Sequence, residues 1–191
     1  MQELRAHSPK VSKRRSRMRR ALIEVATRKF AERGPDGVSI EEIIEGAEMA
    51  RTTFYTFYPS KEDLLADIVL PVFEQGIQDL KRIRIGSPEA VARAIADVYL
   101  GLWQENRDAL IVAKKLGMKY FALIEEVHRA WGEALRRPLD ALEKSGRLRN
   151  GKAAYAAQLI ARSAVQFLEI YGGDACCKEL FRDTMEGLLV K

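Results

Sequence analysis

The chain has 191 residues, of which 47% are hydrophobic and 31% charged, a composition typical of a folded protein rather than a disordered one. It contains no run of about 18 apolar residues that could span a membrane, and its basic N-terminus lacks the apolar segment of a secretory signal. The net charge of +5 is unevenly placed, because residues 1–61 carry 13 Lys/Arg against 8 Asp/Glu, whereas residues 62–191 carry 19 of each. This asymmetry favours a polyanionic partner that meets one end of the molecule; a solvated basic tail is the alternative.

The two cysteines, Cys176 and Cys177, are neighbours in the sequence. Adjacent cysteines rarely bridge to each other, because a disulfide requires a wider separation of the Cα atoms. We therefore expect reduced thiols in a cytoplasmic protein.

Apolar spacings of three and four recur along the chain, which predicts helices throughout. A basic arm over residues 1–15 precedes a first helix over 16–33, whose apolar face contains Leu22, Ala26 and Phe30. Gly34 ends this helix. The segment "SIEE" then predicts a capping box between Ser39 and Glu42, which starts a short second helix over 40–47.

A third short helix is expected over 51–58, since Pro59 disfavours its continuation. Ser60 caps a fourth helix over 61–85 that contains Pro71. Five further helices are expected over 88–105, 107–116, 119–144, 150–171 and from Asp174 to the C-terminus. The prediction is an all-α fold of nine helices, divided into the arm 1–15, a three-helix domain 16–60 and a helical domain 61–191.

Two short helices joined by a tight turn, with a packing helix and a basic arm before them, describe a helix-turn-helix unit. Helical periodicity places Phe54, Phe57 and Tyr58 on the side that packs on the core. The opposite side carries Arg51, Thr52, Tyr55 and Thr56, with Thr53 at its edge. Arginine, hydroxyl and methyl groups suit the base edges and phosphates of a major groove, and Lys61 at the start of the fourth helix suits a phosphate.

The segment "ALIEVATRKFAERGPDGVSIEEIIEGAEMARTTFYTFYPSKEDLL" resembles the N-terminal region of TetR-type transcriptional regulators. The matching features are A-x-x-x-F-x-x-x-G at the end of the first helix, the T-[F/L]-Y-x-x-F-like third helix and x-x-K-x-x-L after it. The chain departs from the family at the turn, where Glu48, Met49 and Ala50 replace Gly-Val-Ser, and also at Thr52 and Phe57. The resemblance implies DNA contacts at Ser39, Arg51, Thr52, Thr53, Tyr55, Tyr58 and Lys61, to which we add Thr56 as a base-edge candidate.

The family resemblance also implies a homodimer on a near-palindromic duplex and a small-molecule effector. The last two helices are the expected dimer surface, since the helix over 150–171 is rich in small residues (Ala153, Ala154, Ala156, Ala157, Ala161 and Ala164). An apolar or aromatic effector is expected between the middle helices, at Tyr99, Trp103, Phe121, Ile124 and His128; core packing is the alternative for each.

Other functional classes receive little support from the sequence. With only two histidines and no phosphate-binding glycine loop or nucleophile elbow, we expect no catalytic residues, no metal site and no cofactor. The prediction is a repressor released from its operator by the effector. The alternatives are a helical protein–protein adaptor and a redox-responsive regulator that uses Cys176 and Cys177.

Overall fold

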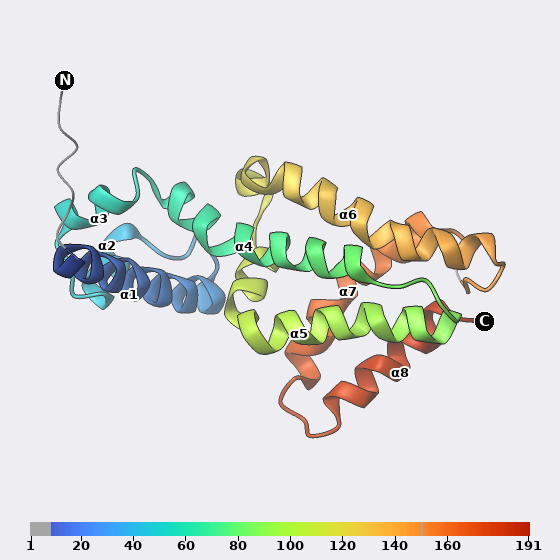
Figure 1. Ribbon diagram of the computed structural model, residues 1–191. Coiled ribbons are helices and arrows are strands. Elements are labelled where there is room, and N and C mark those ends of the chain that lie inside the picture. The colour runs from blue at the N-terminus through green and yellow to red at the C-terminus, as the bar shows by residue number, and fades with distance from the viewer. Residues whose placement is uncertain (1–8, 150) are drawn as a thin grey trace. The chain divides into compact units, whose positions relative to one another are not determined.

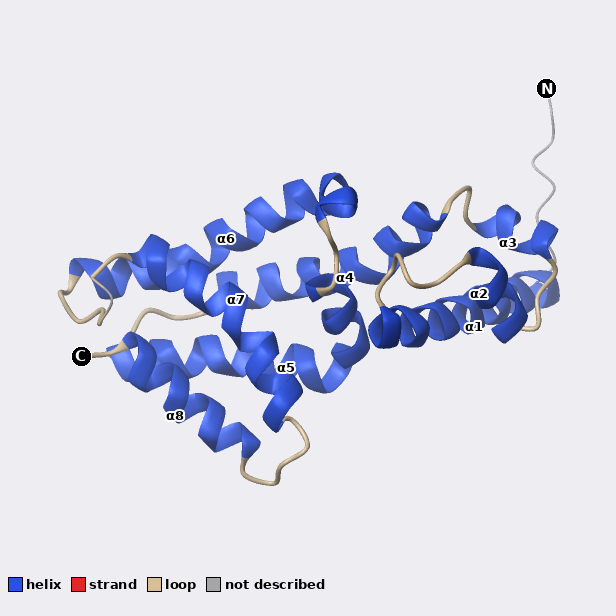
Figure 2. Ribbon diagram, turned by 180° about the vertical axis from the view of Figure 1, so that it is seen from behind, coloured by secondary structure: helices blue, strands red, loops and turns tan. Residues whose placement is uncertain are grey.

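The structure is a computed structural model that describes residues 9–149 and 151–191. Its elements are α1 (Pro9–Arg33), α2 (Ile40–Gly46), α3 (Arg51–Phe57), α4 (Lys61–Arg82), α5 (Pro88–Lys114), η1 (Met118–Tyr120), α6 (Phe121–Lys144), α7 (Ala153–Tyr171) and α8 (Cys177–Leu189) (Figure 1). The described residues form no strand and only one isolated β-bridge, between Leu148 and Val190 (Figure 2). The expected all-α fold is confirmed.

The described residues form eight α-helices and the short 3₁₀ helix η1, and the predicted break between the fifth and sixth helices is wrong. The helices expected over 88–105 and 107–116 are both part of α5. Asn106 alone leaves helical geometry, with φ −138° and ψ 34°, and its side chain donates to Gln75 Oε1 at 3.3 Å. A single asparagine bends this helix without ending it, since neither glycine nor proline lies nearby.

The start of α1 also differs from the prediction. The helix begins at Pro9, so the described part of the expected arm, residues 9–15, is helical; residues 1–8 of that arm lie outside the described residues. Residues 10–20 contain no glycine or proline and are rich in Lys, Arg and Met, which are good helix formers. Pro9 is compatible with the first turn, where its missing N–H is not needed.

The chain divides into two compact units, Met1–Ile68 and Val69–Lys191, so the division falls inside α4. The N-terminal unit is formed by α1, α2, α3 and the first two turns of α4. Its core contains fully buried apolar side chains from all four: Leu22, Ala26, Phe30, Ile43, Phe54, Leu64 and Leu65. Each large side chain buried in this way contributes about 1.5–3 kcal/mol to folding, which is how helices of seven residues are stabilised.

The C-terminal unit is a helical bundle in which α5 packs against α7 and α8, and α6 packs against α7. Ser87 caps α5 as predicted, since its hydroxyl accepts from the Ala90 amide at 3.2 Å. The predicted end of the fourth helix at Ile85 is three residues too late. The guanidinium of Arg137 donates to the carbonyls of Lys81 (3.1 Å) and Ile83 (2.5 Å), which satisfies the end of α4 at Arg82.

A close approach between α4 and α6 occurs at Gly76. A Cβ atom at this position would lie 2.1 Å from the ring of Trp131 and 2.9 Å from Leu102. Both neighbours are buried, so neither can move aside without disturbing the core. The glycine therefore makes room for the tryptophan ring.

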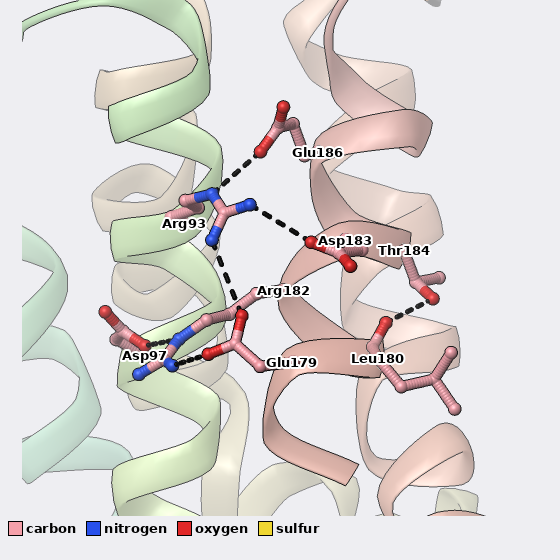
Figure 3. A network of polar contacts seen from close by, with 8 residues as sticks. All are labelled: Arg93, Asp97, Glu179, Leu180, Arg182, Asp183, Thr184 and Glu186. Carbon is pink, nitrogen blue, oxygen red and sulfur yellow. Dashed lines mark hydrogen bonds and ion pairs between the residues drawn. The ribbon is translucent and has the colours of Figure 1, made fainter. Parts of the chain in front are cut away.

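The last helix is held on α5 by a network of charges (Figure 3). Arg93 of α5 pairs with Glu186 at 2.8 Å and with Asp183 at 3.0 Å, whereas Arg182 of α8 reaches back to Asp97 at 2.7 Å. Because the two arginines come from different helices, the network favours one register of α8 along α5. The predicted helix start at Asp174 is wrong, because residues 174–176 form a turn in which the Asp174 carbonyl accepts from the Cys177 amide at 3.0 Å.

Candidate nucleic-acid interface and ligand cavity

The capping box of α2 is present as predicted. The Ser39 hydroxyl accepts from the Glu42 amide at 3.2 Å, and the Glu42 carboxylate accepts from the Ser39 amide at 2.9 Å. Arg33 of α1 donates to the same carboxylate at 2.6 Å. The bond from the Ser39 backbone, followed by that from Arg33, lowers the pKa of Glu42 from 4.5 to about 2. Ser39 itself is exposed, at the start of the helix.

The turn between α2 and α3, where the chain departs from the family pattern, contains one residue with a positive φ. Glu48 has φ 50°, a left-handed conformation that favours glycine. The Met49 amide donates to the Ile44 carbonyl at 2.8 Å, which closes the turn. Ala50 is the N-cap residue of α3, and it offers no side-chain acceptor. The sequence substitutions therefore leave the start of α3 without a local cap.

The two sides of α3 divide much as periodicity predicts. Phe54 is fully buried, and its ring lies edge-on to that of Tyr55 with the centroids 5.2 Å apart. Arg51, Thr52, Tyr55 and Thr56 are exposed, and Thr53 is half-buried. The exposed residues thus form one continuous polar face, which we call the α3 face.

Two residues of the α3 face have internal partners. Arg51 forms an ion pair with Glu41 of α2, and its guanidinium lies 5.8 Å from the centre of the Tyr55 ring. The Thr56 hydroxyl donates to the Thr53 carbonyl at 2.6 Å. Both interactions are exposed to solvent, so the groups can exchange them for another partner at little cost.

Tyr58 and Lys61 are tied into the fold more firmly than the α3 face. Tyr58 is 5% exposed, and its hydroxyl donates to the carboxylate of Asp67. Burial, followed by this bond, raises the pKa of Tyr58. The Lys61 ammonium donates to the carbonyls of Pro35 at 2.8 Å and Val38 at 3.1 Å. Each of these hydrogen bonds therefore connects α4 to another segment of the N-terminal unit.

The basic segment Lys13 to Arg20, which we expect to add backbone or minor-groove contacts to DNA, lies in the first half of α1. Arg19 pairs with Asp67 of α4 at 2.6 Å, and the guanidinium of Arg15 lies 5.5 Å from the centre of the Phe57 ring at the end of α3. The neighbouring basic residues Lys13, Arg14, Arg17 and Arg20 are exposed and form no ion pair with any described residue. The spacing of Arg15 and Arg19, one helical turn apart, is a signal that could have identified these two as the pair with partners inside the unit.

A cavity of about 360 Å³ lies within the C-terminal unit. Four of the five expected pocket residues line it: Tyr99, Phe121, Ile124 and His128. The fifth, Trp103, does not; its indole packs against Gly172, where a Cβ would lie 2.6 Å from Nε1. The sequence analysis missed Lys114 and Arg162, which also line the cavity, because their position depends on how α5 and α7 face each other.

Exposed apolar side chains follow one side of the last two helices. Tyr155, Leu159 and Ile170 of α7 are between 42% and 65% exposed, and Leu180 of α8 is 39% exposed. Hydroxyls near them are satisfied internally. Ser163 donates to the Leu159 carbonyl at 2.7 Å. Thr184 donates to the Leu180 carbonyl at 2.7 Å (Figure 3). Four of the six alanines that suggested close approach to a second subunit are buried in their own unit: Ala153, Ala156, Ala157 and Ala164.

The described residues contain no group of three or more His, Cys, Asp or Glu side chains that could hold a metal ion. No helix among them is both long enough and apolar enough to cross a membrane. Both cysteines are free; Cys176 is exposed and Cys177 buried.

Comparison with known proteins connects this site to a family. Residues 22–68 match the family model described as bacterial regulatory proteins, tetR family. The HTH-type transcriptional regulator EthR of Mycolicibacterium smegmatis is 35% identical over 71 residues, which cover 37% of this chain and 27% of that protein. The chain spans about a third or less of the length of the curated relatives it matches.

Two solved structures share the fold over nearly the whole chain. The ketosteroid transcriptional regulator KstR2 of Mycobacterium tuberculosis has a TM-score of 0.75 at 16% identity, covering 91% of this chain and 95% of that one. AibR, solved in complex with isovaleryl coenzyme A and operator DNA, has a TM-score of 0.74 at 21% identity, covering 91% and 98%. Residues 22–68 therefore resemble the tetR family of bacterial regulatory proteins, and the chain shares the fold of KstR2 and AibR.

Proposed function

We propose that the protein is a homodimeric repressor that binds a near-palindromic DNA duplex and leaves it when a small, mainly apolar or aromatic effector binds. The observation that carries the proposal is the α3 face, an exposed row of arginine, hydroxyl and aromatic side chains on a helix whose opposite side is buried. The segment that contains this face, residues 1–61, also carries the excess positive charge. Such a combination suits a helix that reads the major groove.

Within the α3 face the residues have different roles. Arg51, Thr52 and Thr56 contact base edges, since their side chains are exposed and can release the weak internal partners that two of them have. Thr53 and Tyr55 contact phosphates. Ser39 and Lys61 add phosphate contacts at two helix starts, and the exposed basic residues of α1 add salt-dependent affinity.

Dimerisation through α7 and α8 would bury the apolar side chains that these helices expose. Leu159 and Leu180 are both more than a third exposed, and the hydroxyls beside them need no partner from a second subunit. A dimer presents two α3 helices, which explains why a near-palindromic site is expected.

Helix α4 can connect the cavity to the DNA-binding unit. Val72 and Phe73 of α4 line the cavity, whereas the first two turns of the same helix belong to the N-terminal unit. Pro71 lies between them and cannot donate the backbone hydrogen bond to the carbonyl of Asp67. A ligand that contacts Val72 and Phe73 therefore shifts the population of α4 conformers, which repositions the α3 helices of the dimer. If Pro71→Ala left DNA affinity and ligand response unchanged, Pro71 would have no part in this step.

A redox-responsive regulator is the weaker alternative. Burial raises the pKa of the Cys177 thiol, which disfavours the thiolate that oxidation requires. A Cys176→Ser/Cys177→Ser variant should therefore keep its response to the effector. An adaptor without DNA affinity is the other alternative, and salt dependence separates it from a repressor.

The test is selection of bound duplexes from a random pool, followed by affinity measurements across a salt series. The affinity should fall steeply with salt, and Arg51→Ala should weaken the preference at particular base pairs by about tenfold, whereas Tyr55→Ala should weaken all sequences alike. Arg129→Ala in α6 removes the same charge outside the DNA-binding unit and serves as the control. A protein that stays monomeric and shows no preference among duplexes at low salt would refute the proposal.

A further inference from the structure

The side chains that line the cavity are uneven in charge. None of its lining residues among those described is acidic, whereas Lys114, His128 and Arg162 are basic. Lys114 is neutralised by Glu169, with which it forms an ion pair. Arg162 is exposed and forms no hydrogen bond or ion pair with any described residue, so no described carboxylate competes with a ligand for its guanidinium. A cavity with this lining favours an anionic group on its ligand and disfavours a cation.

Tyr99 provides a second polar group. Its side chain is 2% exposed, and its hydroxyl has no hydrogen-bond partner in the described part of the chain. Burial raises the pKa of Tyr99, and a weaker hydrogen-bonding effect of the Trp131 side chain lowers it; because the indole N–H can only donate, the phenol stays protonated and able to donate to a ligand. Buried hydroxyls without a partner are uncommon in folded proteins, and a bound ligand is one way to satisfy them.

The two polar groups lie toward different ends of the cavity. On α5 the lining residues run from Tyr99 to Lys114, which at about 1.5 Å per residue lie at most roughly 22 Å apart, since α5 bends at Asn106 between them. The centres of the Trp131 and Tyr99 rings are 5.6 Å apart. Trp131 is the last residue of α6 that lines the cavity, so this part of α6 lies at the Tyr99 end. Arg162 lies one turn before Gln166, which accepts from Lys114 at 3.3 Å, so Arg162 belongs to the Lys114 end. The walls between are apolar, with Leu110 and Ile124 among them.

We propose that the cavity binds an elongated, apolar monocarboxylate, with its carboxylate at Arg162 and a hydroxyl or carbonyl group near the other end at Tyr99. The volume of about 360 Å³ suits a ligand of about a dozen non-hydrogen atoms, at the ~30 Å³ that one water molecule occupies in the liquid. This inference rests on the proposed effector role, and it specifies the chemical class of the effector.

The test uses the full chain and four probes that share one alkyl chain: decanoate, decanol, decylamine and ω-hydroxydecanoate. Calorimetry gives the affinities, and emission of Trp131, measured in a Trp103→Phe background that removes the other tryptophan, reports where binding occurs. Decanoate should bind more tightly than decanol by about tenfold or more, and decylamine least tightly. Arg162→Gln should abolish the advantage of decanoate over decanol. ω-Hydroxydecanoate should exceed decanoate in the wild type but not in Tyr99→Phe.

Arg136→Gln is the matched control, because Arg136 lies on α6, pairs with Asp140 at 3.6 Å and does not line the cavity. Sedimentation of each variant shows whether the assembly is unchanged. Equal binding of decanoate and decanol, no binding of any probe, or a loss of dimerisation in Arg162→Gln with probe affinity intact would each overturn the inference. DNA selection on the same preparations tests the proposed function separately. Neither Arg162 nor Tyr99 belongs to the DNA-binding unit, so the variants should still select DNA even if the inference about the ligand is wrong.

Discussion

Helices α2 and α3 are both seven residues long and follow one another in the chain, but different interactions hold them. The start of α2 is fixed locally by the reciprocal bonds of Ser39 and Glu42. The start of α3 has no side-chain cap and follows Glu48, which has a left-handed backbone. Helix α3 is stabilised by the burial of its own Phe54 side chain and by the contact of Arg15 with Phe57 at its end. A short helix can thus be specified by its termini or by one buried face.

The largest expected effect comes from removing the burial that holds α3. Phe54→Ala should reduce the free energy of unfolding of the N-terminal unit by about 3–5 kcal/mol, because it empties a fully buried site. Hydrogen exchange of the α3 amides would measure the loss. Thr52→Ala, on the exposed side, is the control and should have little effect on exchange. Equal effects of the two substitutions would mean that burial does not hold α3.

The local cap of α2 should matter less than that burial. Ser39→Ala removes the acceptor for the Glu42 amide and should cost about 1 kcal/mol. Faster exchange of α2 amides, with the tryptophan emission of the C-terminal unit unchanged during urea unfolding, would confirm it. If α3 lost protection as much as α2, the two helices would not be held independently.

Supplying the missing cap should make α3 resemble α2. Ala50→Ser gives α3 an N-cap acceptor and should stabilise the N-terminal unit by up to about 1 kcal/mol. Slower exchange of the Arg51–Phe57 amides would confirm it. A neutral or destabilising result would show that the backbone at Glu48 prevents cap geometry, and Glu48→Gly combined with Ala50→Ser would then test that explanation.

The smallest effect is the pH dependence of the α2 cap. Glu42 has its pKa lowered to about 2 in the folded protein, so the unfolded chain binds a proton there that the folded one does not between pH 4.5 and 2. The stability that Glu42 contributes is therefore present above pH 4.5 and is lost as the pH falls toward 2. Glu42→Gln should show a shallower loss of the urea midpoint in this range. Parallel curves for wild type and variant would contradict the assignment.

Much of the fold could be predicted because its signals are local. The caps at Ser39 and Ser87 each depend on residues three positions apart, and the structure contains both. The bend at Asn106 and the early start of α1 were missed, since one asparagine or a run of basic residues fits either a helix or a loop.

The candidate sites also contain some features that local sequence signals predict and others that they do not. Exposure on α3 follows from helical periodicity, and the predicted side proved exposed at Arg51, Thr52, Tyr55 and Thr56. Burial of Tyr58 and the absence of Trp103 from the cavity depend on packing between helices, as does the presence of Arg162 in it. Those features come from residues far apart in the sequence, which spacing alone cannot bring together.

The close contact between the Trp131 ring and Gly76 makes the residue allowed at each of these two positions depend on the residue at the other. Any side chain at 76 would meet the indole ring, so that site is restricted to glycine for as long as 131 holds tryptophan. Because Trp131 also lines the cavity, we expect related proteins with a bulkier residue at 76 to have a smaller one at 131, and hence a differently shaped binding space. Paired substitution at these two sites would be a route by which the lineage changes its effector while keeping its fold.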